Sequence, residues 1–298
     1  MRDKSKKHVK KTKTPESAGS LLRSIFMDLL VEEKRQAGLR PDDLYYVGMA
    51  NTAQWWWCGR KSILANREME LDFFVAHLSD RIEYSAKLGY VDEEVWEKFQ
   101  SAALPADELR RILHGLPELR MEDIEQVLKM RERGGDCPKE PTPEEITQLL
   151  REMLREAAIA EGIRLELERA EKYSTIRWAF DWEDFKVVGV PDGITDEFVY
   201  EFKTTRNNFL LRFVKPVAFA QADLYGYFFK RLKKRVQILI RETGEVKTWV
   251  EPVSTDNAEA TLRSLREAVR GSQAPRAPKP WKCRACEFRE KCSTYFRG

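Results

Sequence analysis

Long apolar segments are missing from this sequence. None of its apolar runs approaches the roughly 20 residues that a helix needs to cross a bilayer. No apolar signal-peptide region precedes its cysteines. We therefore expect a soluble, cytoplasmic protein with no membrane partner.

A phosphate-binding loop, an internal repeat and a large net charge are also missing. Because no G-x4-G-K-[ST] motif occurs, a helicase within this chain is excluded. The net charge of +3 is too small to indicate a partner. Basic residues nevertheless gather in two runs, at 2–13 and 230–235. Both runs suit phosphate, although charge runs usually form solvated surface, and we expect the first run to be disordered.

Cysteine is scarce, but three of the five cysteines are crowded near the C-terminus. Cys283, Cys286 and Cys292 form a C-x2-C-x5-C cluster that lacks one ligand of a quartet. Cys58 is the candidate for that ligand, and it would clasp together segments more than two hundred residues apart. Four cysteines hold an iron–sulfur cluster or tetrahedral zinc, and ligand softness does not separate the two. Disulfides or unrelated thiols are the third interpretation, with Cys137 as the spare cysteine in each case.

The apolar pattern predicts an α/β protein. Helical spacing covers 17–37, and short helices separated by proline and glycine breaks are expected over about 62–170. From Ser174 the pattern becomes strand-like and is typical of an antiparallel meander. The elements expected from there on are strands at 175–182, 185–190 and 198–203, a helix at 208–232, a hairpin that turns at Thr243–Gly244, and a helix at 255–270.

Two carboxylates and a lysine stand out in the strand region. Asp192 falls where one strand ends in a turn, and Glu201 and Lys203 lie two residues apart on the next strand. Because side chains alternate between the two faces of a strand, Glu201 and Lys203 share one face with Val199, and Phe202 lies on the opposite face. Two carboxylates from adjacent strands form a hard-oxygen site for Mg2+ or Mn2+, and a nearby ammonium can orient an attacking water. For an isolated E-x-K motif, a surface salt bridge is the ordinary interpretation.

Further motifs accompany this site. G-x-P-D at 189–192, followed by E-x-K at 201–203, resembles the core of the PD-(D/E)XK (restriction-endonuclease-like) nuclease superfamily. Gln221 and Tyr225 match the Q-x3-Y motif of its RecB-like branch, and their i,i+4 spacing places both on one helix face.

The cysteine pattern narrows the resemblance. An early cysteine followed by Arg60 and Lys61, together with the terminal cysteine cluster, resembles the RecB-like iron–sulfur nucleases, above all the CRISPR-associated Cas-four exonucleases. AddB-type DNA-repair nuclease domains share this cysteine frame. The resemblance covers about 45–66 and 160–298 and leaves the middle of the chain unmatched.

The resemblance implies a mixed sheet flanked by helices, with a helical insertion and a C-terminal iron–sulfur clasp. It divides the chain into a basic disordered arm at 1–16, an N-terminal helical part with the first cluster cysteine at 17–66, a helical insertion at 67–150, the nuclease core at 151–270, and a linker with the cysteine cluster at 271–298.

Individual roles follow from the same resemblance. It implies a structural [4Fe-4S] or, less often, [2Fe-2S] cluster on the four cysteines, and Mg2+ or Mn2+ at the active site. Asp192, Glu201 and the carbonyl of Phe202 would bind the metal, Lys203 would be the catalytic lysine, and Gln221 and Tyr225 would contact DNA or steady the site. The implied partners are single-stranded DNA ends and CRISPR adaptation proteins, and the implied activity is end trimming, as in spacer-precursor processing.

One position departs from the family. Where a histidine ligand is usual, this sequence places Glu166, with Glu156 and Glu161 as neighbouring candidates and His77 as a distant one. A glutamate also suits Mg2+. This departure keeps open a catalytically reduced nuclease fold that binds DNA or serves as a scaffold, beside an AddB-like repair nuclease and a zinc-stabilised RNA-processing nuclease. Near Cys58, we expect Arg60 and Lys61 to bind DNA phosphate.

Overall fold

The computed structural model describes residues 18–101, 104–134, 164–165, 168–271, 275–276, 278–284 and 286–296. The chain divides into two units, Met1–Pro41 and Asp42–Gly298. The described part of the first unit contains α1 (Ala18–Gln36), whose last turn carries Lys34 and Arg35. Cations suit the end of a helix because the helix dipole is negative there. Lys34 also donates to the carbonyl of Pro41 at 3.1 Å.

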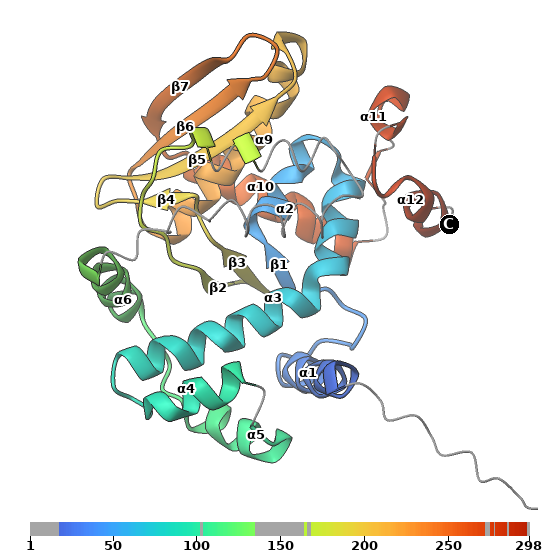
Figure 1. Cartoon of the computed structure of the whole chain (residues 1–298). Coiled ribbons are helices and arrows are strands. Elements are labelled where there is room, and N and C mark those ends of the chain that lie inside the picture. The colour runs from blue at the N-terminus through green and yellow to red at the C-terminus, as the bar shows by residue number, and fades with distance from the viewer. Residues whose placement is uncertain are drawn as a thin grey trace, which may run out of the picture. The chain divides into compact units, whose positions relative to one another are not determined.

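The second unit begins with one strand and a run of helices and then contains most of its strands (Figure 1). Its first half contains β1 (Tyr46–Gly48), α2 (Met49–Ala53), the 3-10 turn η1 (Gln54–Trp56), α3 (Gly59–Lys87), α4 (Glu93–Gln100), α5 (Ala106–Gly115) and α6 (Met121–Gly134). Its second half contains β2 (Trp178–Trp182), β3 (Phe185–Gly189), β4 (Gly193–Ile194), β5 (Phe198–Thr205), α9 (Asn208–Phe228), β6 (Lys233–Ile240), β7 (Glu245–Pro252), α10 (Thr255–Arg270), α11 (Pro280–Arg284) and α12 (Arg289–Tyr295).

The strands form two mixed sheets flanked by helices, so the predicted α/β class is confirmed. One sheet has the order β1-β3-β2 and the other the order β4-β5-β6-β7. β1 is parallel to β3, and β5 is parallel to β6, whereas the other neighbouring pairs are antiparallel. The expected single meander is therefore wrong: β3 and β5 belong to different sheets, because the short β4 lies beside β5 and a strand from the N-terminal side pairs with β3.

The parallel pair of β5 and β6 is made possible by α9, since parallel strands need a crossover connection. The helix begins after Asn207, whose side-chain oxygen accepts from the backbone N–H of Leu210 at 3.1 Å. Its apolar side covers both strands: Ala220 packs in the same core cluster as Val199 of β5, and Ala218 packs against Val236 of β6. This side of the sheet is also the side of Glu201, because residues 199 and 201 share a face.

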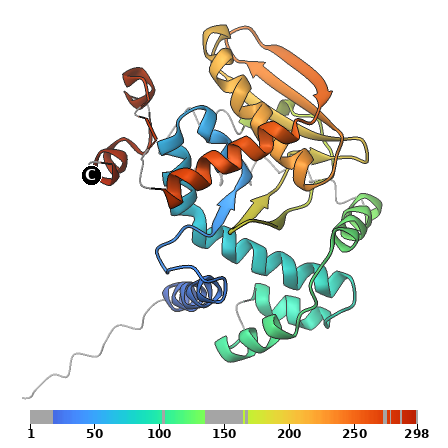
Figure 2. The ribbon, with the colours of Figure 1, turned by 180° about the vertical axis from the view of Figure 1, so that it is seen from behind.

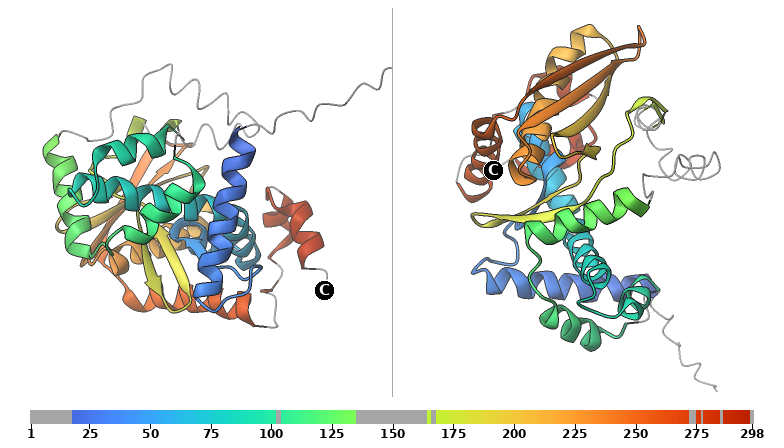
Figure 3. Two further views of the ribbon diagram at one scale, coloured as in Figure 1. Left: turned by 90° about the horizontal axis from the view of Figure 1, so that it is seen from below. Right: turned by 90° about the vertical axis from the view of Figure 1, so that its left-hand side faces the viewer.

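α3 is the longest helix among the described residues and joins distant parts of the second unit. Its N-terminal half meets β1, where Asn66 accepts from the backbone N–H of Gly48 at 2.9 Å. Its C-terminal half carries Asp80, whose carboxylate accepts two hydrogen bonds from Arg177 at 2.7 and 2.9 Å. α4 packs against it (Figure 3). The boundary expected at residue 67 therefore falls inside a continuous helix.

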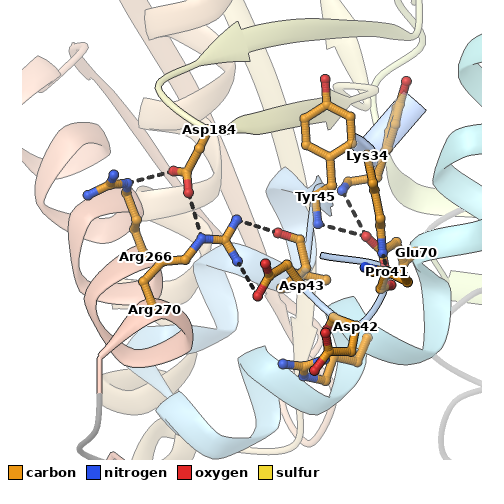
Figure 4. A network of polar contacts seen from close by, with 12 residues as sticks. Lys34, Pro41, Asp42, Asp43, Tyr45, Glu70, Asp184, Arg266 and Arg270 are labelled. Atoms are coloured by element: carbon orange, nitrogen blue, oxygen red, sulfur yellow. Dashed lines mark hydrogen bonds and ion pairs between the residues drawn. The ribbon is translucent and has the colours of Figure 1, made fainter. Parts of the chain in front are cut away.

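α10 packs against α9 and α2 (Figure 2) and ends in an arginine network. Arg270 donates to Asp184 at 2.5 Å and to the carbonyl of Leu44 at 2.7 Å, while Arg266 donates to Asp184 at 2.6 Å (Figure 4). Asp184 lies in the β2–β3 turn, and Leu44 leads into β1. Because β1 and β3 are parallel, the network therefore fixes the beginnings of both strands, at one end of the smaller sheet, to one helix.

Candidate functional site

Asp192 lies in the short connection between β3 and β4 and faces the middle of β5. Its Oδ2 accepts from the backbone N–H of Phe202 at 2.7 Å. This bond places the carboxylate beside the residue that precedes Phe202, which is Glu201. The strand end and the E-x-K segment therefore converge, as expected from the sequence.

Glu201 and Lys203 form an ion pair on the α9 side of β5. The side chain of Glu201 is 0% exposed, whereas that of Lys203 is 29% exposed. The ordinary interpretation of E-x-K as a surface salt bridge is therefore wrong for this glutamate. A buried carboxylate is costly unless charges and hydrogen bonds compensate it, and the ammonium of Lys203 supplies a compensating charge here. On the opposite face, Phe202 packs with Tyr200 and Leu239.

The electrostatics around Asp192 reflect this burial. Burial raises the pKa of Asp192, while the charge of Lys203 and the hydrogen bond from Phe202 lower it. A buried carboxyl with opposing perturbations and a specific cation nearby is typical of functional sites, although structural ion pairs also produce it.

Asp192 and Glu201 are the two predicted carboxylate ligands that the fold brings together. Glu166, the expected third ligand, and the alternatives Glu156 and Glu161 lie outside the described residues. Within the part of the chain that the structure describes, no group of three or more His, Cys, Asp or Glu side chains is arranged to hold a metal ion.

His77, the distant candidate ligand, lies buried on α3 among aromatic rings. Its ring centroid is 5.1 Å from that of Trp178 and 6.0 Å from that of Tyr46. Burial first, and then the charges of Arg81 and Lys186, lower its pKa. These contacts fit a neutral, packed structural histidine.

Gln221 and Tyr225 lie on one face of α9, as their spacing predicts. The Gln221 amide donates to the Tyr225 hydroxyl at 2.8 Å, and both side chains are buried. Tyr225 belongs to the same core cluster as Val199, which shares a face of β5 with Glu201. The amide oxygen of Gln221 accepts no hydrogen bond from any residue that the structure describes.

The four cysteines of the predicted quartet line one cavity of about 50 Å3. Cys58 directly precedes α3, and the other three come from the C-terminal segment that contains α11 and α12. All four are free thiols. The spare Cys137 lies outside the described residues. The sequence prediction that Cys58 approaches the terminal cluster agrees with this arrangement.

The walls of this cavity are partly apolar and partly cationic. Leu64 and Phe288 form a buried cluster against which Cys286 and Cys292 pack. Lys61, Lys282 and Arg289 also line the cavity. Four sulfur donors with nearby cations suit either an iron–sulfur cluster or zinc, since both need the cysteines as thiolates. The donor type therefore matches such a group, but no three of these side chains are positioned as metal ligands in the part of the chain that the structure describes.

Arg60 and Lys61, expected to bind DNA, contact the C-terminal segment. Arg60 donates to the carbonyl of Pro275 at 2.9 Å, and its guanidinium lies 4.8 Å from the centroid of the Phe296 ring. Lys61 pairs with Glu287 at 2.8 Å. Their contacts hold the cysteine-bearing segment to the start of α3, and a role in DNA binding stays a prediction.

The basic run at 230–235 differs from the solvated face that its charges suggest. Lys234 is buried and pairs with Asp223 at 2.5 Å, Arg231 pairs with Glu125 at 2.8 Å, and Arg235 pairs with Glu171 at 2.5 Å. Three cations of this run therefore take part in internal ion pairs, which sequence reasoning missed because each partner lies on another element.

Comparisons with known proteins supply no identity. No family model and no curated protein matches this chain. A solved structure described as the crystal structure of SSO0001 is similar over 90% of this chain and 94% of that chain, at 14% sequence identity and a TM-score of 0.34. A likeness of this size carries no argument about function. No described helix is long and apolar enough to cross a membrane.

Proposed function

We propose that this chain is a metal-dependent deoxyribonuclease of the PD-(D/E)XK type whose four cysteines hold a structural iron–sulfur cluster. One observation carries the proposal: Asp192, Glu201 and Lys203 come together from adjacent chain segments around a fully buried glutamate. The geometry supports the motif, because the hydrogen bond from Phe202 to Asp192 and the burial of Glu201 fix both carboxylates within the fold.

The residues of the candidate site would have different roles in the reaction. Asp192 and Glu201, with the carbonyl of Phe202, would hold Mg2+ or Mn2+, and a bound ion supplies Lewis acidity toward the phosphate and a more acidic water. Lys203 reaches from the buried glutamate toward solvent. Its ammonium can orient the water that attacks phosphorus and can stabilise the negative charge that develops as the P–O bond breaks.

The cysteine cavity supports the second half of the proposal. Its four thiols come from both ends of the second unit. The trimming of single-stranded ends and the contact with CRISPR adaptation proteins rest on the sequence motifs. Zinc in place of the cluster is distinguished by the absence of acid-labile sulfide.

A cleavage assay with matched variants tests the activity. Asp192→Asn, Glu201→Gln and Lys203→Ala should each lower cleavage of end-labelled DNA by roughly 100-fold or more, because each removes a metal ligand or the charge that stabilises the transition state. Asp181→Asn is the control, since this exposed carboxylate pairs with Lys186 away from the site. Circular dichroism checks that each variant is folded.

Two outcomes would contradict the proposal. A Glu201→Gln protein that cleaves at the wild-type rate removes this glutamate from the reaction. A wild-type protein that binds DNA without cleaving it, in Mg2+ or Mn2+ and with its cysteine site loaded, supports the scaffolding alternative.

A further inference from the structure

Four aromatic rings from three distant segments gather beside the cysteine cavity, and we call them the aromatic platform. Trp57 precedes α3, Phe209 and Phe213 lie in the first turns of α9, and Trp281 lies in α11. The ring centroids of Phe213 and Trp281 are 5.1 Å apart, those of Trp57 and Trp281 are 5.7 Å apart, and those of Phe209 and Phe213 are 5.8 Å apart. Such distances are those of aromatic pairs in contact.

Cations lie directly over these rings. The guanidinium of Arg212 is 4.0 Å from the centroid of Phe209. The ammonium of Lys282 is 4.6 Å from the centroid of Trp57 and 5.1 Å from that of Phe213. The single acidic residue of α9, Asp223, is buried and paired with Lys234, and α11 contains no acidic residue. The platform therefore presents aromatic surface and positive charge without an opposing carboxylate from either helix.

Part of the platform is open to solvent. Phe209 is 55% exposed, Arg212 is exposed, and the other three aromatic residues are half-buried. Core packing explains a half-buried ring, but it does not explain a phenylalanine that is more than half exposed beside an exposed arginine. Exposed aromatic side chains next to cations are typical of surfaces that stack nucleic-acid bases and pair with phosphate.

The platform lies on the same helix row as the residues beside the candidate active site. Phe209, Phe213, Val217, Gln221 and Tyr225 follow one another at intervals of four. Each step of four residues turns the row by about 40°, so the row passes from the exposed Phe209 into the core, where Val217, Gln221 and Tyr225 are buried.

We propose that the aromatic platform binds a single-stranded nucleic acid, with bases stacked on Phe209 and the neighbouring rings and with phosphates paired to Arg212 and Lys282. The direction in which the strand continues, toward Lys203, rests on the proposed nuclease function; the binding itself does not. Lys282 also donates to the carbonyl of Trp57 at 2.7 Å, and both residues line the cysteine cavity. The cysteine segment thereby positions two members of the binding surface.

Binding measured without cleavage tests the platform. The full chain, with its cysteine site loaded and with Ca2+ in place of Mg2+ and Mn2+ to prevent cleavage, is titrated against fluorescent oligothymidine and against the same strand with abasic positions. Phe209→Ala and Arg212→Ala should each weaken oligothymidine binding by roughly 5-fold or more, since base–aromatic stacking and phosphate contacts contribute on this scale. Wild-type protein should prefer oligothymidine to the abasic strand, and Phe209→Ala should lose most of that preference.

Matched controls separate the platform from general surface effects. Tyr295→Ala removes another exposed aromatic residue with an arginine 5.5 Å from its ring centroid, and Arg263→Ala removes another exposed arginine. Both should bind like wild type. Equal affinities of wild type and Phe209→Ala, or equal affinity of wild type for the two strands, would overturn the proposal. Because this experiment measures binding, its result is independent of the cleavage assay. Either the platform or the proposed nuclease activity can therefore be refuted while the other is supported.

Discussion

Lys234 illustrates at the residue scale how a partner decides the role of a charge. The sequence places it in a basic run, but its ammonium lies 2.5 Å from Asp223 in the interior. The same carboxylate accepts from the backbone N–H of Ser254 and from the side chain of Asn257, both at 2.7 Å. Asp223 therefore joins α9, β6 and the start of α10.

Removing the ammonium of Lys234 should destabilise the folded protein. Lys234→Ala leaves a buried carboxylate without its cation, and we expect the free energy of unfolding to fall by about 3–5 kcal/mol. Lys233→Ala is the matched control, because Lys233 is 56% exposed and lies 3.7 Å from an exposed glutamate. That variant should change the free energy by less than about 1 kcal/mol. Urea denaturation measures both, and similar values for the two variants would show that the buried pair is not a major source of stability.

At the element scale, the arginine network of α10 fixes the smaller sheet. Burial raises the pKa of Asp184, but the hydrogen bonds and charges of Arg270 and Arg266 outweigh it, so that the pKa lies below its usual value of 3.8. A depressed pKa means that the folded state favours the ionised form. The network therefore contributes stability above the usual pKa, and this contribution is lost as the pH falls through the folded pKa.

Arg270→Ala should reveal this contribution. We expect a loss of about 1–3 kcal/mol near neutral pH, because the variant removes charged hydrogen bonds to Asp184 and to the carbonyl of Leu44. The difference between wild type and variant should shrink as the pH approaches about 3. Chemical denaturation across this pH range measures it. A difference that stays constant would mean that packing, rather than the ionised Asp184, accounts for the loss.

The helices and strands also show how much of the fold could be predicted from the sequence. The helix expected at 208–232 and the hairpin at Thr243–Gly244 are present as α9 and β6–β7, because their apolar periodicity and turn residues are strong local signals. β1 was missed because three residues, Tyr46–Gly48, are too few to show a period. The split into two sheets was missed because pairing between distant strands leaves no local signal.

The candidate site, too, could be predicted from the sequence in part. Strand alternation and helix spacing are local, so they were enough to group Glu201 with Lys203 and Gln221 with Tyr225. The burial of Glu201 depends on α9 packing across β5, and the platform depends on α11 approaching α9. Neither follows from one segment alone. The i,i+4 spacing of Phe209 and Phe213 was the sequence signal that could have suggested the platform.

At the scale of the whole second unit, the cysteine cavity joins the start of α3 to the C-terminal segment. Cys58→Ala and Cys286→Ala should therefore lose the bound group and stability to a similar extent, since each removes one thiolate from the same cavity. Iron and acid-labile sulfide analysis with thermal unfolding measures both effects. Cys137→Ser is the control and should retain the group. A Cys58→Ala protein with full iron content would place the fourth ligand elsewhere.

The distance between Cys58 and Cys283 along the chain also sets an order of events during synthesis. More than two hundred residues separate the two cysteines. At about 5–20 residues per second, the ribosome needs roughly 10–45 s to make that stretch. Cys58 thus leaves the ribosome long before its partners exist, and the cavity is the last feature of the second unit that can close. A nascent chain interrupted within that interval carries Cys58 without its three partners, which makes premature termination and oxidation the particular hazards of producing this protein.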